Sequence, residues 1–211
     1  TVRWTDERTV VVGGSAGSGT WRVFDWEPIA EVDSVRLGAT LGSRHFTVDS
    51  AGVMIVTDLA SGSTEVIFSD PPADSTATAM DAAGDIVAIA YSAAQGHLVI
   101  ADSASGEARE IALPTCSPLA LSLSADATTA YLACFEMDTN LTRVDLRTGE
   151  TTSAPAPHQV ALGVRALNDG VIWGGQGGVV FRSALDLTSV EPVTYDAGCA
   201  APIRKFVGAQ D

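Results

Sequence analysis

A serine in a glycine-rich segment is the first residue of the chain whose surroundings could support catalysis. Residues 13–17, Gly-Gly-Ser-Ala-Gly, have the Gly-x-Ser-x-Gly spacing of a nucleophile elbow. In that motif the serine stands on a turn between a strand and a helix, and a histidine and an acid complete the site. Here the segment lies between two strand-like runs, 10–12 and 21–24, and no helical pattern follows it. The sequence therefore favours a hairpin turn, and we expect no catalytic residue.

Oxygen-bearing side chains alternate at Glu136, Asp138 and Asn140, as they do in a calcium-binding loop. An EF-hand also needs a glycine at its sixth position and an acidic residue at its twelfth, where this chain has Arg147. None of the histidines has a second His or Cys at metal-ligand spacing, and they lie at His45, His97 and His158. We therefore expect a solvated loop at 136–140, and neither a metal nor a cofactor.

Three further features have both a functional and a structural interpretation. The sequon Asn140-Leu-Thr142 matters only in a secreted protein of a glycosylating host. The glycine-rich segment 174–178 has the composition of a phosphate cradle, but it opens no helix and is better read as a hairpin. The tryptophans are packing residues or, alternatively, a stacking platform for a sugar or peptide: Trp4, Trp21, Trp26 and Trp173.

The charge of the chain excludes some partners. The 211 residues include 26 acidic and 12 basic side chains, for a net charge of −14, and Lys205 is the single lysine. So acidic a chain repels phosphate backbones, and we expect no nucleic-acid partner. Apolar residues make up 46% of the chain, enough for a core, but no run approaches the roughly 18 residues of a membrane span. Arginine in place of lysine, with abundant Ala, Gly and Thr, suggests a GC-rich genome.

The cysteines leave the redox state open. Cys116, Cys134 and Cys199 are odd in number and widely spaced, so one disulfide and three free thiols are both compatible with the sequence. No charged segment followed by an apolar run begins the sequence, so no signal peptide is visible. The compartment, cytoplasmic or extracytoplasmic, is therefore not predicted.

Two different turns recur with the same period. The turn Asp-x-x-Ser/Thr-Gly begins at Asp58, Asp102 and Asp145, and a degenerate copy begins at Asp186, with spacings of 44, 43 and 41 residues. A second turn is marked by small residues spaced by 42, 43 and 43 residues, at Gly42, Gly84, Ala127 and Gly170. Asp at the start of such a turn accepts hydrogen bonds from its own backbone, and Gly supplies a positive φ. We therefore interpret the recurrent aspartates as hairpin formers.

Short β-type runs fill each period, at 86–91, 98–101, 129–135, 141–144, 171–173 and 179–181. Four strands per period of about 43 residues are typical of a β-propeller blade. We predict an all-β protein, a β-propeller of four-stranded antiparallel blades at 1–33, 34–73, 74–117, 118–158 and 159–202, with an extra strand at 203–207. Five blades and one strand fit either a five-bladed ring with a decorated end or part of a six- or seven-bladed ring. In the second case the missing blades, or a neighbouring domain of the same protein, lie outside this chain.

The repeat resembles the WD40-like and YVTN-like bacterial propellers. WD40 repeats end their third strand in Trp-Asp, and the corresponding pairs here are Phe24-Asp25, Thr57-Asp58, Ala101-Asp102, Val144-Asp145 and Leu185-Asp186. The Asp and the turn agree with the family, but the Trp is absent, and Gly96-His97 is the single Gly-His pair and lies in another hairpin. The resemblance implies the fold over nearly the whole chain and leaves the function open, because propellers include scaffolds, sensors, lectins and enzymes.

In a propeller the loops between blades share one face with the loops between second and third strands, and binding loops on rigid scaffolds often carry function. We expect these loops at 70–75, 114–118, 155–158 and 196–202, and at 15–19, 93–97, 136–140 and 176–178. The predicted binding residues are Trp21, His97, Asp138, Asn140, His158 and Gln176.

We predict that the chain is a non-catalytic scaffold or sensor domain that binds a protein or peptide, and two alternative functions stay open. These are a small-ligand or sugar-binding propeller, and a propeller hydrolase or lactonase with its site in the axial funnel. Because the first strands (76–80, 119–123 and 160–164) carry mostly small or apolar side chains, the sequence favours the first reading.

Overall fold

The chain is all β. The computed structural model describes the backbone of residues 2–4, 9–14, 17–22 and 28–32, and then residues 37–135, 141–154, 161–175 and 179–193. These residues form twenty strands and no helix, so the described part of the chain contains no helix long and apolar enough to cross a membrane. The predicted strand 203–207 lies outside the described residues.

The strands pair into five antiparallel sheets of four, each in sequence order from first to fourth strand. The first two sheets contain β1 (Val2–Trp4), β2 (Thr9–Gly14), β3 (Gly17–Arg22) and β4 (Pro28–Val32), then β5 (Leu37–Leu41), β6 (Arg44–Val48), β7 (Met54–Asp58) and β8 (Thr64–Phe68). The third contains β9 (Thr76–Ala83), β10 (Ile86–Ser92), β11 (Gly96–Asp102) and β12 (Ala108–Leu113). The last two contain β13 (Pro118–Leu123), β14 (Thr129–Cys134), β15 (Leu141–Asp145) and β16 (Thr151–Ala154), then β17 (Ala161–Leu167), β18 (Gly170–Gly175), β19 (Val180–Ser183) and β20 (Val190–Val193).

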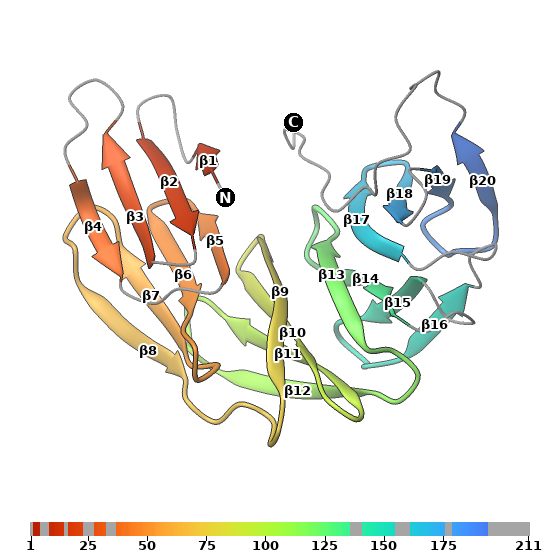
Figure 1. Cartoon of the computed structure of the whole chain (residues 1–211), viewed down its shortest axis with the longest axis horizontal. Helices are drawn as coiled ribbons and strands as arrows, with labels where there is room; N and C mark the ends of the chain where they lie inside the picture. Colours follow the sequence, from red (N-terminus) through yellow and green to blue (C-terminus); the bar gives the residue numbers. More distant parts are fainter. Residues whose placement is uncertain are drawn as a thin grey trace.

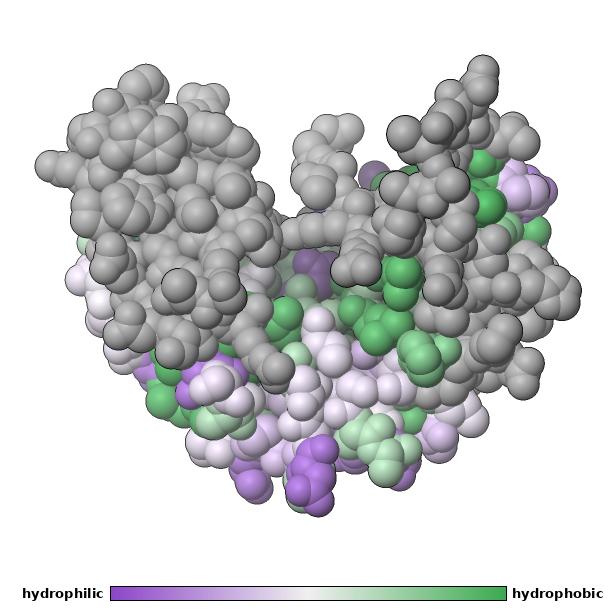
Figure 2. Space-filling model, in the orientation of Figure 1, coloured by the Kyte–Doolittle hydropathy of each residue, from purple (hydrophilic) through white to green (hydrophobic). Residues whose placement is uncertain are grey.

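The five sheets follow one another in an arc, with the first and fifth sheets at its two ends (Figure 1). The first strands of neighbouring sheets contact each other, β5 with β9, β9 with β13 and β13 with β17. These first strands line the inner side of the arc, where apolar side chains gather, whereas hydrophilic ones gather at the outer rim (Figure 2). The predicted four-stranded antiparallel unit is therefore confirmed. The predicted strand 21–24 begins earlier than expected, because β3 occupies Gly17–Arg22, and residues 23 and 24 lie outside the described part of the chain.

Three apolar clusters fill the spaces between the second and third, third and fourth, and fourth and fifth sheets. Middle strands are buried on both faces, so they are continuously apolar instead of alternating. The strand β10 is an example, since Val87 to Tyr91 are all fully buried. Trp173 is also buried, with its ring stacked on Phe181 at a centroid distance of 4.5 Å. The packing interpretation of this tryptophan is thereby confirmed.

The recurrent aspartates build turns, as predicted. Asp58 Oδ1 accepts hydrogen bonds from the backbone N–H groups of Ala60 (3.0 Å) and Ser61 (2.8 Å). The backbone N–H of Gly62 donates to the Asp58 carbonyl at 2.8 Å, and Gly62 has a φ of 72°. The turns that begin at Asp102 and Asp145 repeat this pattern, with Gly106 and Gly149 at φ values of 74° and 79°.

The two turns share one period because they touch. In each of three sheets, the N–H of the residue after the aspartate donates to a carbonyl in the hairpin that joins the first two strands. The pairs are Leu59 to Ser43 (2.8 Å), Ser103 to Asp85 (2.7 Å) and Leu146 to Thr128 (2.8 Å). An insertion in either turn would move this donor away from its acceptor, so the two spacings stay coupled.

The degenerate fourth copy is built differently from the prediction. In the three regular turns the N–H of the aspartate donates to the carbonyl five residues later, as from Asp145 to Glu150. In the fifth sheet the corresponding bond runs from Ala184 to Ser189, at 3.3 Å. Asp186 therefore lies two residues beyond the position of the other aspartates, at the tip of the turn, and Leu187 takes the positive φ, 63°. The register of Asp186 in the predicted repeat was wrong.

The turn aspartates should make the free energy of unfolding depend on pH in the acidic range. Backbone hydrogen bonds from Ser61, Ser105 and Thr148 lower the pKa of Asp58, Asp102 and Asp145, respectively, below the ordinary value of 3.8. A lowered pKa stabilises the folded chain above the ordinary value, and this contribution disappears as the pH falls through the lowered pKa.

We expect the urea midpoint to fall below about pH 4, and to fall less steeply when the three aspartates are replaced together by Asn. Asn keeps an acceptor for the turn but has no proton to gain. Urea unfolding of both proteins between about pH 7 and about pH 2 measures the difference. Parallel pH profiles for the two proteins would contradict the interpretation.

Candidate functional site

The predicted binding residues are placed only in part. His97 lies on β11, and its Nδ1 is 2.6 Å from Glu110 Oε1 on the adjacent strand β12, with 19% of the histidine side chain exposed. Trp21 lies within β3, where the backbone alone is described. Asp138, Asn140, His158 and Gln176 lie outside the described residues, as do the loops 136–140, 155–158, 176–178 and 196–202. The predicted face is therefore visible at 70–75, 93–97 and 114–118.

A disulfide braces this face. Cys116, in the loop before β13, is bonded to Cys134, at the end of β14, with Cα atoms 5.1 Å apart. The pairing of β13 with β14 explains the contact, because Pro118 lies opposite Cys134 in the register. Of the two alternatives that the sequence left open, one disulfide is the one observed. Cys199 lies outside the described residues.

Close packing holds the same loop. An added Cβ at Gly96 would lie 1.9 Å from the carbonyl oxygen of Cys116, so β11 can approach the loop only because residue 96 is glycine. The hydroxyls of Ser92 and Ser117 are 2.7 Å apart, and the Ser117 carbonyl accepts a hydrogen bond from the N–H of Phe135 at 2.9 Å. The loop 114–118 is therefore fixed to three strands of two neighbouring sheets.

Phe135 follows β14 directly and lies beside this braced loop, to which its backbone N–H is hydrogen-bonded. The sequence places it in a strand, but β14 ends at Cys134, and 61% of the Phe135 surface is exposed. It is the most exposed of the large apolar side chains in the described part of the chain. A large aromatic ring next to a disulfide is costly to leave in water and loses little freedom on binding, as is typical of a binding hot spot.

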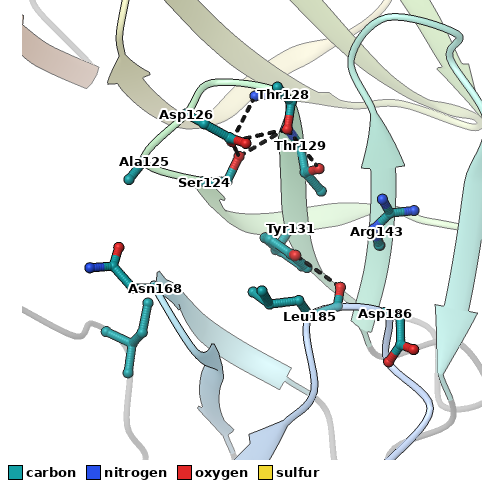
Figure 3. A pocket seen from close by; sticks show the side chains of 11 residues that line it. Ser124, Ala125, Asp126, Thr128, Thr129, Tyr131, Arg143, Asn168, Leu185 and Asp186 are labelled. Atoms are coloured by element: carbon teal, nitrogen blue, oxygen red, sulfur yellow. Dashed lines mark hydrogen bonds between the residues drawn. The ribbon is translucent and has the colours of Figure 1, made fainter.

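A recess lies at the ends of the strands opposite to this face. It occupies about 410 Å³ between the fourth and fifth sheets, on the side of the hairpins that join first to second and third to fourth strands. Its lining residues come from both sheets: Ser124, Ala125, Asp126, Thr128, Thr129, Tyr131, Arg143, Leu167, Asn168, Leu185 and Asp186. We call it the sheet 4/5 groove. Figure 3 shows Tyr131 at its centre, with Asn168 to one side and Arg143 to the other.

The hydroxyl of Tyr131 ties the two walls of the groove together. It donates a hydrogen bond of 2.9 Å to the carbonyl of Leu185, which lies in the turn after β19 (Figure 3). Burial raises the pKa of Tyr131, so the proton that makes this bond is retained at neutral pH. The groove is therefore part of a fixed interface between the two sheets.

A buried aspartate on the inner side of the arc, Asp81, connects the first strands of neighbouring sheets, and the sequence did not predict this role. Asp81 lies on β9, beyond the predicted end of that strand, and is buried. Its Oδ2 accepts hydrogen bonds from the N–H of Leu123 (2.9 Å) and from the hydroxyl of Ser122 (3.4 Å), while Ser122 Oγ accepts one from the N–H of Ala166 (3.1 Å). Asp81 thus joins the first strands of three sheets, which is a structural role. No group of three or more His, Cys, Asp or Glu among the described residues is placed to hold a metal ion.

Comparison with known proteins gives a likeness of fold. No family model and no curated protein matches the chain. Among solved structures, a chain of the "Crystal structure of Nidogen/Laminin Complex" superposes with a TM-score of 0.67 at 12% sequence identity. The alignment covers 87% of this chain and 74% of that one. At this identity the similarity is one of architecture, so the chain is an all-β protein of successive four-stranded sheets with the fold of its structural neighbour.

Proposed function

We propose that the five sheets are blades of a β-propeller of the WD40-like or YVTN-like kind, and that the domain is a non-catalytic module that binds a protein or peptide. The arc of sheets with their first strands innermost supports the arrangement, as does the likeness of fold to a chain of the Nidogen/Laminin complex. That structure is of a protein complex by its description, which agrees with a binding role. An arc of this kind leaves room for further blades from the same protein or from another chain.

The disulfide supports a location outside the reducing cytosol. Disulfides persist in secreted, periplasmic and cell-surface proteins and are rare where thioredoxin and glutathione keep thiols reduced. The Cys116–Cys134 bond closes a loop within one sheet and is part of the packing of the predicted binding face. We infer that the domain works in an oxidising compartment, where its partner would also be found.

The observation that carries the binding proposal is the exposed ring of Phe135, which lies beside the braced loop 114–118. Interfaces obtain most of their affinity from a few aromatic or arginine anchors, which are surrounded by residues that exclude water. The backbone that carries the ring is held by the disulfide of the preceding residue, Cys134, and by the hydrogen bond from the Phe135 N–H to the Ser117 carbonyl, so the attachment point of the ring is fixed before the partner arrives. The entropic cost of binding is correspondingly smaller.

Replacing Phe135 with Ser should abolish partner capture while leaving the fold intact, because the ring is largely in water. Affinity capture from an extract of the source cells, followed by mass spectrometry, compares wild type with F135S. The matched control is V66S, which removes another exposed apolar side chain (55% exposed) from the outer strand β8. One protein should be recovered by wild type and V66S and lost with F135S, whereas equal recovery by all three would remove Phe135 from the interface.

A further inference from the structure

We propose that the sheet 4/5 groove is a second binding site, and that its ligand is an extended peptide segment in which basic and apolar residues alternate. The site lies at the ends of the strands opposite to Phe135, so it is independent of the function proposed above. Several residues that line the groove differ from their equivalents in the second and third sheets.

The groove lies where the repeat changes, between the fourth and fifth sheets. Aligning the sheets by their hairpin hydrogen bonds matches the cross-strand pair Tyr131–Arg143 with Ala88–Ile100 and with Phe46–Val56. Both of those pairs are buried in the apolar clusters that fill the two preceding interfaces. At the fourth sheet, a phenol and a guanidinium replace them. The Tyr131 ring is still buried in the cluster between the fourth and fifth sheets, and the recess lies beside it and Arg143.

The walls of the groove also depart from the repeat. Two residues separate the first and second strands in the other sheets from β5 onward, as at Asn168 and Asp169, but the fourth sheet has the longer turn 124–128. The opposite wall is the turn that carries Asp186, which is displaced by two residues from the other turns. Positions that follow the repeat are explained by the fold, whereas two irregular turns that face each other across a recess point to a separate role.

The groove is lined by two carboxylates, Asp126 and Asp186, and by one guanidinium, Arg143, so its net charge is negative. Hydrogen bonds from the Ser124 and Thr128 side chains reach Asp126 Oδ1 at 2.6 and 2.9 Å, and the Thr188 hydroxyl reaches Asp186 Oδ1 at 2.7 Å. These bonds lower the pKa of both carboxyl groups, that of Ser124 most for Asp126 and that of Thr188 most for Asp186. Both aspartates are therefore ionised at neutral pH, in a chain whose net charge is −14. Charge complementarity favours a cationic ligand.

The remaining lining residues specify the rest of the ligand. Leu167 and Leu185 are 39% and 40% exposed, so the groove offers apolar surface to a partner side chain. Arg143 and Asn168 have N–H donors of the kind that bind the carbonyl groups of an extended backbone. Carboxylates for lysine or arginine, leucines for apolar side chains and donors for the backbone together fit a peptide better than a free metal ion or a sugar.

A synthetic peptide tests the proposal on the whole chain. The probe is a fluorescein-labelled octapeptide of alternating Leu and Lys, and binding is measured by fluorescence anisotropy. Two comparison peptides replace Lys with Glu or Leu with Ser. We expect the Leu/Lys peptide to bind, the Glu form to bind at least about tenfold more weakly, and the Ser form to lose affinity as well.

Variants then locate the site. D186N keeps an acceptor for Thr188 but removes the charge, and should weaken binding of the Leu/Lys peptide about tenfold. D169N is the matched control, because Asp169 is exposed in the next turn and pairs with Arg182 outside the groove. It changes the net charge equally and should weaken binding less than about twofold. F135S should bind the peptide as wild type does, which separates this test from that of the proposed function.

Three results would overturn the proposal. They are no binding of the Leu/Lys peptide, equal binding of the Glu peptide, and equal losses for D186N and D169N. The last result would mean that the peptide is attracted by the net charge of the chain and not by the groove.

Discussion

Replacing Cys116 and Cys134 together with Ala is expected to lower the free energy of unfolding by about 3 kcal/mol. The bond closes a loop between residues 18 positions apart, and the loss of this constraint raises the entropy of the unfolded chain. The effect should extend beyond the cross-link itself, because the same loop holds β11 through Gly96 and Phe135 through Ser117. Urea unfolding followed by circular dichroism measures the change.

Cys199→Ala is the matched control for the disulfide, because it removes a cysteine and leaves the Cys116–Cys134 bond in place. It should unfold at the wild-type urea concentration, and a reducing agent should destabilise wild type and C199A but not the double variant. Equal stability of all three proteins, with no response to reductant, would show that the disulfide does not stabilise the chain.

Trp173→Ala is expected to be the most destabilising single substitution in the fifth sheet, with a loss of about 3–5 kcal/mol. The side chain is 1% exposed, its ring stacks on Phe181, and its Nε1 donates a hydrogen bond of 2.9 Å to Ser183 Oγ. Removing the ring would leave a cavity in the cluster that joins the fourth and fifth sheets. Thermal and urea unfolding measure the loss.

A conservative variant separates the two contributions of Trp173. Trp173→Phe keeps most of the apolar volume and the stacking but loses the hydrogen bond to Ser183, so its stability should lie between those of wild type and the Ala variant. If the Ala variant were as stable as wild type, Trp173 would not be a packing residue, and the alternative of a surface for stacking a ligand would be favoured.

The sequence predicted those features that depend on local chemistry. Asp58, Asp102 and Asp145 form their turns with residues two to five positions away, so the short pattern Asp-x-x-Ser/Thr-Gly contains most of the interaction. The period of about 43 residues followed from repetition of that pattern, and the four-stranded sheets followed from the period. Asp186 looked like a fourth copy because the backbone register that displaces it by two residues is not encoded in the spacing of one aspartate.

The features of both candidate sites depend on contacts between distant residues. The cysteines 116 and 134 come together only through the pairing of β13 with β14, and Gly96 is required only because another sheet's loop packs against it. The groove could have been suspected from one comparison, which is that Tyr131 and Arg143 are polar where the two preceding repeats are apolar. Such a comparison requires the register of all four strands, which hydrophobic patterns alone do not fix.

We expect the disulfide-braced face around Phe135 to bind a protein, and site-specific photo-cross-linking can capture that protein in the source cells. A benzoyl-phenylalanine side chain at position 135 differs from the native ring by one added group, and the same side chain at position 66 on β8 is the control. Irradiation in the source cells should join position 135, but not position 66, to a single protein. An excess of the F135S variant should not compete for that protein. The absence of any cross-linked protein at position 135, or the same products from both positions, would contradict the claim.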